Sequence, residues 1–217
     1  MKTIVYIARH SKAFKDLLEE YNSFETEQIR NEKNPLSVEG EKRADKLSMI
    51  EELRDVEVVY SSHYVRAMAT AKYVCEVNKI KLNVDSRFGE RRFGVDKISD
   101  LPKDFFEKQT LDWDYKLDGG ESLNEVSCRM KNCFFDLLDK YNDKTIMIVS
   151  HGTALTTMLK DWCQIKYNFD TKLVELYFAG EMIFDGNWSA PELFRLEFEN
   201  KKLVDIRNIE VDYGKGL

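Results

Sequence analysis

Arg9 and His10 combine a cation that can hold an anion with an imidazole that can attack it or carry a proton. They directly follow the apolar run Ile-Val-Tyr-Ile-Ala at residues 4–8. A second apolar run, at residues 146–149, likewise ends in Ser-His-Gly at residues 150–152. Such short runs are typical of strands buried on both faces, and open α/β sheets bind ligands beyond the carboxyl ends of their strands. We therefore expect both histidines at one ligand-binding edge of a sheet.

A third candidate, Arg66, lies between these two runs. Residues 55–60 have the pattern of a strand, and Ser61-Ser62 then precedes an expected helix whose first turn contains Arg66. The helix dipole favours anions at this end, so a cation there gains nothing from the helix itself. The position of Arg66 indicates an anionic partner, although a surface arginine would be the simpler interpretation if Arg66 stood alone.

These groups belong to a longer series of motifs that resembles the histidine phosphatase superfamily, which includes phosphoglycerate mutases and many small phosphatases. The series follows the family's order from residue 4 to about residue 160 and consists of Arg9-His10, Ser61-Ser62-His63-Tyr64-Val65-Arg66-Ala67, Glu90-Arg91-Arg92-Phe93-Gly94, Gly119-Gly120-Glu121-Ser122 and Ser150-His151-Gly152. The resemblance implies a phosphomonoesterase that acts through a phosphohistidine intermediate on a small phosphorylated metabolite and releases inorganic phosphate.

The resemblance also implies a clamp for the phosphate group. Arg9 and Arg66 would offer rigid forks of donors to the phosphate oxygens. His151 and the backbone amide of Gly152, at a helix start, would add donors to the same phosphate. Because guanidinium groups would stabilise the charge of the transferred phosphoryl group, we expect no metal ion and no cofactor.

Two residues would make and break the bonds. Neutral His10 would attack phosphorus as the nucleophile while its other ring nitrogen is oriented by an acceptor. Glu90 would protonate the leaving oxygen and later take a proton from water. Nothing in the sequence near Glu90 fixes its position except the Glu-x-x-Phe-Gly spacing.

The chain departs from the family's pattern in the loop after His10. The family usually has glycine where Ser11 stands, and the frequent threonine and asparagine are replaced by Lys-Ala-Phe-Lys-Asp at residues 12–16. Serine would either keep the shape of the loop and add a hydroxyl donor, or impair the pocket. Phosphate contacts from residues 12–16 would then be missing or supplied by other residues.

The surrounding elements predict a single α/β domain over residues 1–217, a length that suits one core. Strand-like and helix-like segments alternate, which predicts a three-layer sandwich with a mostly parallel central sheet and helices on both faces. Segments 193–198 and 203–206 predict a C-terminal hairpin, around residues 200–201, at an edge of the same sheet.

Helix starts are the clearest local signals in the chain. Ser37 is a candidate N-cap, and Ser122 with Glu125 forms a capping box before an apolar stripe. A further helix is expected after the second apolar run, because Leu155, Met158, Leu159, Trp162 and Cys163 recur at helical spacing.

Residues 95–118 are expected to form a lid-like insertion over the site. They contain four lysines and seven acids, a net charge of -3, with several aromatic residues interspersed. An acidic lid suits a leaving group that is not heavily anionic. This argument favours a phosphatase over a mutase, because mutases carry further arginines there for a second anionic group.

Bulk properties exclude several classes of partner. The net charge is -6, which argues against a nucleic-acid binder, and no apolar stretch has the length of a membrane span. The start of the chain lacks the pattern of a signal peptide. The four cysteines have no CxxC spacing and are expected to be reduced, so we predict a cytoplasmic protein. The oligomeric state and the natural substrate stay open.

Three alternative functions remain at this stage. Glu90-Arg91-Arg92-Phe93-Gly94 is similar to the corresponding motif of phosphoglycerate mutases, which keeps mutase-type phosphotransfer open. A non-catalytic, phosphate-binding regulatory protein would keep the pocket and lose turnover through Ser11. Finally, His10, His63 and His151 would make a three-histidine metal site if they converged.

Overall fold

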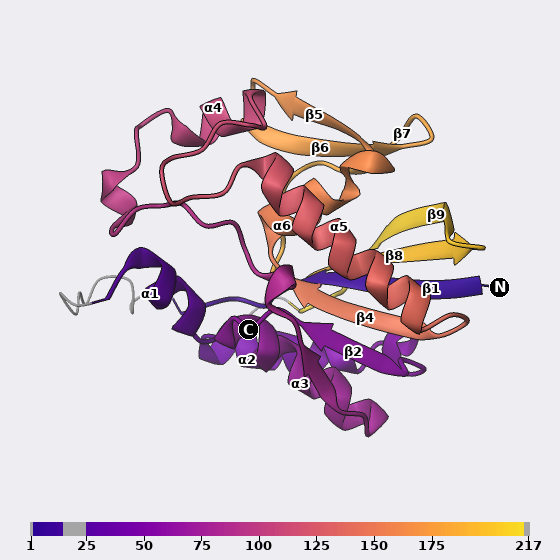
Figure 1. Ribbon diagram of the computed structural model, residues 1–217. Coiled ribbons are helices and arrows are strands. Elements are labelled where there is room, and N and C mark those ends of the chain that lie inside the picture. The colour runs from indigo at the N-terminus through magenta and orange to yellow at the C-terminus, as the bar shows by residue number, and fades with distance from the viewer. Residues whose placement is uncertain (1, 15–24, 215–217) are drawn as a thin grey trace.

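The computed structural model describes residues 2–14 and 25–214. Its centre is a six-stranded sheet in the order β3-β2-β4-β1-β8-β9 (Figure 1). The strands are β1 (Lys2–Arg9), β2 (Val58–Ser61), β3 (Leu82–Val84), β4 (Thr145–Ser150), β8 (Glu192–Glu199) and β9 (Lys202–Ile209). The first four pair in parallel, whereas β8 and β9 form an antiparallel hairpin beside β1. The predicted sheet and its C-terminal hairpin are confirmed.

Strand β1 shows why the first apolar run forms a fully buried strand. Val5 and Ile7 belong to the apolar cluster on one face of the sheet, and Tyr6 and Ala8 belong to the cluster on the other face. Side chains alternate between faces along a strand, so burial on both faces requires a continuous apolar run. The result is a rigid strand that ends at Arg9 and His10.

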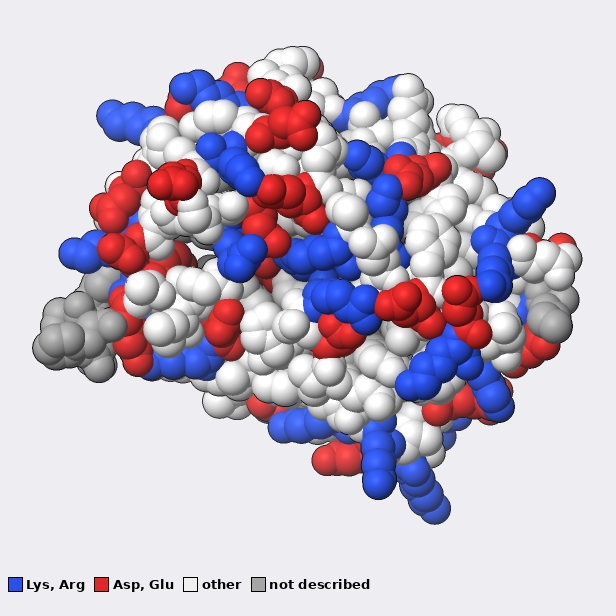
Figure 2. Space-filling view, in the orientation of Figure 1, with Lys and Arg blue, Asp and Glu red and all other residues white. Residues whose placement is uncertain are grey.

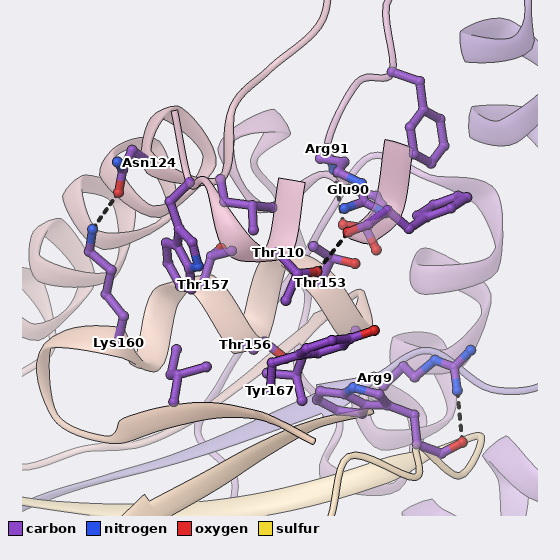
Figure 3. A pocket seen from close by; sticks show the side chains of 18 of the residues that line it. Arg9, Glu90, Arg91, Thr110, Asn124, Thr153, Thr156, Thr157, Lys160 and Tyr167 are labelled. Atoms are coloured by element: carbon purple, nitrogen blue, oxygen red, sulfur yellow. Dashed lines mark hydrogen bonds between the residues drawn. The ribbon is translucent and has the colours of Figure 1, made fainter. Parts of the chain in front are cut away.

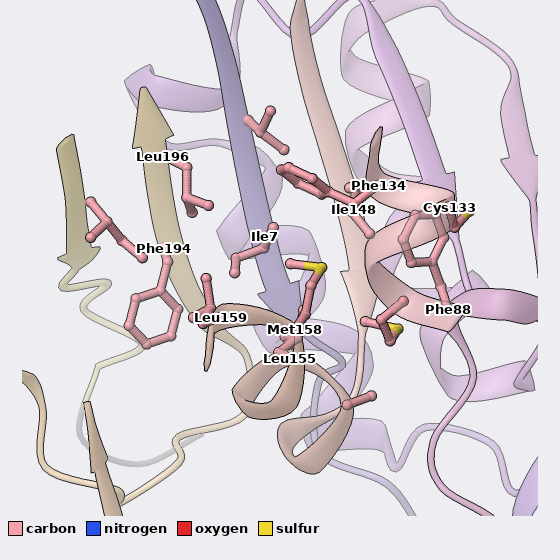
Figure 4. Close-up of a cluster of buried hydrophobic side chains, with 14 of the residues drawn as sticks. Ile7, Phe88, Cys133, Phe134, Ile148, Leu155, Met158, Leu159, Phe194 and Leu196 are labelled. Atoms are coloured by element: carbon pink, nitrogen blue, oxygen red, sulfur yellow. The ribbon is translucent and has the colours of Figure 1, made fainter. Parts of the chain in front are cut away.

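Helices cover both faces of the sheet, as the alternating pattern predicts. On the face of Tyr6 lie α2 (Val38–Ser48) and α3 (Val65–Asn78), and on the opposite face lie α5 (Leu123–Lys140) and α6 (Gly152–Met158). The larger apolar cluster packs under α5 and α6 (Figure 4) and includes Ile7, Phe134, Ile148, Leu155, Met158, Phe194 and Leu196. Burying each of these side chains contributes roughly 1.5–3 kcal/mol before entropy is counted.

The predicted helix starts are confirmed by their caps. Ser37 Oγ accepts a hydrogen bond from the Gly40 amide at 3.0 Å. Ser122 and Glu125 make both hydrogen bonds of the capping box at the start of α5. These local interactions satisfy backbone donors that a helix start leaves unpaired.

The helix after β4 is shorter than predicted. α6 ends at Met158, and a 3₁₀ turn at Leu159–Asp161 follows. The backbone amides of Trp162 and Cys163 both donate to the Leu159 carbonyl, and the chain then enters a strand. The prediction was wrong for the last turn because helical spacing of apolar residues does not reveal where a chain must turn.

A second, three-stranded antiparallel sheet was not expected from the sequence. It consists of β5 (Gln164–Asn168), β6 (Leu173–Phe178) and β7 (Glu181–Phe184). The turn between β6 and β7 consists of Ala179 and Gly180, whose φ angles are both in the left-handed region. Figure 1 shows β5 and β6 beside α4, above α6.

The remaining elements are short. They are α1 (Glu27–Lys33), α4 (Phe105–Leu111) and 3₁₀ turns at Glu51–Leu53, Ser86–Phe88 and Ile98–Asp100. Gly94 has a φ of +78°, and a Cβ there would lie 2.4 Å from the Asp118 carbonyl oxygen, so only glycine fits where the ends of the 95–118 segment meet. Within residues 2–14 and 25–214, no helix is long and apolar enough to cross a membrane.

Candidate active site

The ends of β1 and β4 meet at one edge of the sheet, as the sequence predicts. Arg9 pairs with Ser150 in the parallel register, and the His10 amide donates to the Ser150 carbonyl at 2.9 Å. The ring centroids of His10 and His151 are 5.1 Å apart. Two strands adjacent in the sheet but distant in sequence therefore bring both histidines together.

A cavity of about 730 Å³ opens beside this edge (Figure 3). Five of the six candidate site residues line it, namely Arg9, His10, Arg66, Glu90 and Gly152. His151 is fully buried and is not among the lining residues. The structure thus brings all six residues into one neighbourhood, with His151 behind the cavity wall.

The hydrogen bonds of His10 define its tautomer. Nδ1 lies 2.7 Å from the Ser11 carbonyl oxygen, which can only accept, so Nδ1 carries the proton. Nε2 accepts from Arg66 Nε at 3.0 Å, so it carries no proton and its lone pair is directed at Arg66. Burial, and next the positive charges of Arg66 and Arg9, hold the pKa of His10 well below its ordinary value. His10 is therefore neutral, with Nε2 available as a nucleophile.

Arg66 connects both histidines to helix α1. Besides His10, it donates to the Asn31 carbonyl oxygen and, at 3.3 Å, to His151 Nδ1. Its guanidinium also lies 4.8 Å from the centroid of the Tyr64 ring. Arg66 is 6% exposed, and no carboxylate within residues 2–14 and 25–214 pairs with it, so it is a buried cation directed at the cavity.

His151 is held by groups that fix its protonation. Arg66 can only donate to Nδ1, so the ring proton is on Nε2, which lies 2.8 Å from Ser62 Oγ. Burial, followed by the electrostatic influence of His10 and Arg66, holds the pKa of His151 well below its ordinary value. His151 is therefore neutral and accepts from Arg66.

Arg9 is anchored by a loop that the sequence did not mark. Its NH1 donates to the carbonyl oxygens of Trp188 and Ser189 at 3.0 and 3.1 Å. The Trp188 ring approaches Gly152 so closely that a Cβ on this glycine would lie 3.4 Å from the ring. Trp188 therefore forms a wall of the cavity next to the strand ends.

Glu90 is held in position by contacts that no local pattern indicates. Its Oε1 accepts from the amides of Arg91 and Ala154 at 2.9 and 3.1 Å. Arg129 donates to the carbonyl oxygens of Arg87, Gly89 and Glu90, and it pairs with the buried Glu121. The loop that carries Glu90 is therefore fixed by α5 and α6 together.

Ser11 does not contribute to the cavity. Its Oγ donates to the Gly40 carbonyl oxygen at 2.7 Å, and its amide donates to Thr70 Oγ1 at 2.9 Å. Ser11 has no positive φ, so the backbone at this position does not require glycine. The hydroxyl thus joins the loop to α2. The prediction for residues 12–16 lies partly outside the described residues.

The three histidines do not form a metal site. His63 Nε2 pairs with Glu32 at 3.2 Å, and His63 does not line the cavity of His10. Among residues 2–14 and 25–214, no group of three or more histidine, cysteine, aspartate or glutamate residues is arranged to hold a metal ion. The three-histidine metal site considered from the sequence is therefore excluded by geometry.

The acidic residues of segment 95–118 do not line the cavity. From this segment only Phe106, Thr110 and Trp113 do so. Among the described residues, four cations line the cavity, Arg9, Arg66, Arg91 and Lys160, and one carboxylate, that of Glu90. On the face that Figure 2 shows, acidic and basic side chains are interspersed. The acids of the expected lid therefore do not contribute to the described wall of the cavity, where cations outnumber carboxylates.

Five residues around the cavity were not expected there from the sequence, namely Asn31, Arg129, Trp188, Lys160 and Tyr167. Asn31 and Trp188 act through backbone carbonyl oxygens, which carry no residue signature. Arg129 alone offered a signal, since it is a single arginine within the polar face of α5.

Comparison with known proteins agrees with this geometry. The family model of the histidine phosphatase superfamily (branch 1) matches residues 5–174. Phosphoserine phosphatase 1 of Hydrogenobacter thermophilus is 26% identical over 132 residues, and the match spans 57% of this chain and 62% of that protein's length.

Solved structures show the same fold. A mutant phosphoserine phosphatase from Entamoeba histolytica in complex with phosphoserine superposes with a TM-score of 0.64 at 17% identity, covering 94% of this chain and 96% of that one. A mycobacterial glucosyl-3-phosphoglycerate phosphatase superposes with a TM-score of 0.65 at 18% identity, covering 96% and 97%. With the family model matching most of its length, the chain belongs to the histidine phosphatase superfamily, branch 1.

Proposed function

We propose that this chain is a phosphoric monoester hydrolase that acts without a metal ion, through a phosphohistidine formed on His10. The observation that carries the proposal is the state of His10: Nδ1–H is tied to the Ser11 carbonyl oxygen, and the lone pair of Nε2 lies beside Arg66 in the cavity. An oriented, neutral imidazole next to a buried cation is what attack on a phosphate ester requires.

In the first step, Nε2 of His10 attacks phosphorus, a P–N bond forms and the bond to the ester oxygen breaks. Arg66 and Arg9 hold the phosphate oxygens, and Arg66 exchanges its contact with His10 for contacts with them. A phosphate dianion beside His151 favours protonation of this ring, which then donates from Nδ1. Glu90 gives a proton to the leaving oxygen, which requires that it enters this step protonated.

In the second step, Glu90 takes a proton from a water molecule as that water attacks phosphorus. The P–N bond breaks, its electron pair returns to Nε2 of His10, and inorganic phosphate leaves. Because each step inverts the phosphorus centre, the water must approach from the side that the leaving group occupied. Glu90 lines that cavity, and its Oε1 is held by two backbone amides.

The proposed substrates are small phosphorylated metabolites, and the cellular location is proposed to be cytoplasmic. Similarity to phosphoserine phosphatase 1 supports a small phosphate ester. Segment 95–118 acts as a lid in this proposal, because Phe106, Thr110 and Trp113 cover one side of the cavity.

The test is hydrolysis of p-nitrophenyl phosphate with EDTA present. Its good leaving group probes the nucleophile and the clamp with little demand on Glu90. We expect turnover by the native protein and a loss of at least about 10⁴-fold in His10→Ala, as for removal of other catalytic nucleophiles. His63→Ala is the matched control, since His63 lies outside the cavity. Absence of turnover in the native protein, or turnover that survives in His10→Ala, would contradict the proposal.

A further inference from the structure

The cavity extends well beyond the phosphate end. Gly152 begins α6 at that end, and Lys160 lies in the 3₁₀ turn that continues the helix. Both line the cavity, as do three threonines between them. A helix rises about 1.5 Å per residue, so the eight steps between these residues span roughly 12 Å. Figure 3 shows Lys160 and Arg9 on opposite sides of the cavity.

This length exceeds what a serine-sized leaving group occupies. Phosphoserine has four bonds between its phosphorus and its carboxyl carbon, so with bonds of about 1.5 Å it spans less than about 6 Å and would fill only the phosphate end. The volume of about 730 Å³ lies within the range of sites that bind whole drug-sized ligands.

Apolar and aromatic side chains also line the cavity. Trp113 follows α4, Leu123 begins α5, Ile165 and Tyr167 lie on β5, and Val174 lies on β6. Aromatic and aliphatic surfaces of this kind favour a ligand with an apolar or aromatic body. Figure 3 shows the Tyr167 ring along the lower wall of the cavity.

A positively charged group lies at the end of these walls. Lys160 Nζ donates to Asn124 Oδ1 at 2.6 Å and lies 5.1 Å from the Trp113 ring centroid. Asp114 accepts from the Asn124 amide nitrogen at 2.7 Å, which orients the Asn124 carbonyl oxygen toward Lys160. None of the ion pairs found within residues 2–14 and 25–214 involves Lys160, so its charge is positioned without being neutralised by a direct contact.

We propose that Trp113, Tyr167 and Lys160 form a subsite for the leaving group, specific for an apolar or aromatic body that ends in an anionic group. The substrate would then be an elongated phosphomonoester with a carboxylate or second phosphate at its far end. This inference rests on the proposed function, because it assigns the leaving group of the same reaction. It makes Lys160 a specificity-determining residue, and among the described residues that line the cavity only Glu90 carries a carboxylate.

The test compares two esters that differ in one end group, para-carboxyethylphenyl phosphate and para-propylphenyl phosphate. We expect the native protein to prefer the carboxylate by roughly 10- to 100-fold in kcat/KM, the range of a charge-assisted hydrogen bond. Lys160→Met should bring the ratio of the two kcat/KM values close to one. The ratio is taken within each variant, so changes in the amount of folded protein cancel.

Lys166→Met is the matched control. Lys166 is exposed and lies 4.1 Å from the Tyr177 ring centroid, so it is also a lysine over an aromatic ring, but it does not line the cavity. This variant should keep the native ratio. Equal kcat/KM for both esters in the native protein, or an unchanged ratio in Lys160→Met, would overturn the subsite.

Failure of the proposed function would be seen separately. If the native protein does not hydrolyse p-nitrophenyl phosphate, the two aryl esters can be titrated into His10→Ala by calorimetry. The subsite is supported without turnover if His10→Ala binds the carboxylate ester roughly tenfold more tightly than the propyl ester. This difference should disappear in the double variant that combines His10→Ala with Lys160→Met. Equal binding of the two esters to His10→Ala would rule it out.

Discussion

The two ends of the cavity are held by different forces. At the phosphate end, Arg66 contacts His10, His151 and Asn31, and each of these groups has a further directional partner or backbone anchor. At the far end, apolar side chains from three separate segments surround a single lysine. Hydrogen-bond networks demand one geometry, whereas apolar walls tolerate changes of shape. A protein built in this way can accept substrates with different leaving groups while the residues around the phosphate stay in place.

The largest effect should come from breaking the network at its centre with Arg66→Lys. A lysine keeps the charge but offers a point donor where the guanidinium makes three contacts. We expect kcat for p-nitrophenyl phosphate to fall by about 10²- to 10³-fold, as when one preorganised donor is removed. The exposed Arg54→Lys serves as the control. A nearly native kcat in Arg66→Lys would show that the phosphate end tolerates change as the far end does.

Arg129→Met tests whether α5 holds Glu90 in position. The change leaves Glu121, whose side chain is 7% exposed, without its closest ion-pair partner, so unfolding free energy should fall by about 3 kcal/mol in urea titrations. Glu121→Gln in the same protein should recover part of this loss. As Arg129 acts through the Glu90 loop, kcat should fall more for phenyl phosphate than for p-nitrophenyl phosphate. Arg87→Met, which breaks exposed pairs, is the comparison.

The buried histidines predict how stability depends on pH. His10 and His151 have folded-state pKa values well below the ordinary 6.5, so the unfolded chain takes up protons first as pH falls. Stability is therefore fully present above about pH 6.5 and falls below it by up to about 1.4 kcal/mol per pH unit for each histidine. Urea titrations between about pH 7 and 5 measure this slope, and His151→Gln should reduce it. An unchanged slope in that variant would mean that His151 is protonated in the folded protein.

Ser11→Gly should have the smallest effect, although Ser11 adjoins the nucleophile. The change removes the hydrogen bond to the Gly40 carbonyl oxygen and loosens the unfolded chain, which together cost about 1 kcal/mol of stability. Because the Ser11 hydroxyl is directed away from the cavity, kcat should remain close to the native value. A large loss of kcat would show that the loop after β1 is part of the directional network.

The strand endings could be predicted because their signals are local. A continuous apolar run marks a strand buried on both faces, and parallel strands place their carboxyl ends at one edge, so Arg9, His10 and His151 could be brought together from sequence. The capping box of Ser122 and the C-terminal hairpin are also short-range patterns. The site was therefore foreseeable where each residue follows directly from the strand or helix that carries it.

Contacts between distant segments could not be predicted. Glu90 is fixed by Arg129 and by the Ala154 amide, which are far from it in sequence. The sheet of β5 to β7 was missed, and the sequence did not show that segment 95–118, expected as an acidic lid, lines the cavity with Phe106, Thr110 and Trp113.

The sequence by itself determined the order of the motifs and the alternation of strands and helices, because these depend on periodicity and on neighbouring residues, and its resemblance to a family implied the six candidate site residues. Only the tertiary structure decided which nitrogen of His10 carries no proton, what holds Glu90 in position and which charged side chains line the cavity. Those properties depend on the direction of side chains and on partners tens of residues away. Neither can be read from composition or from a local sequence pattern.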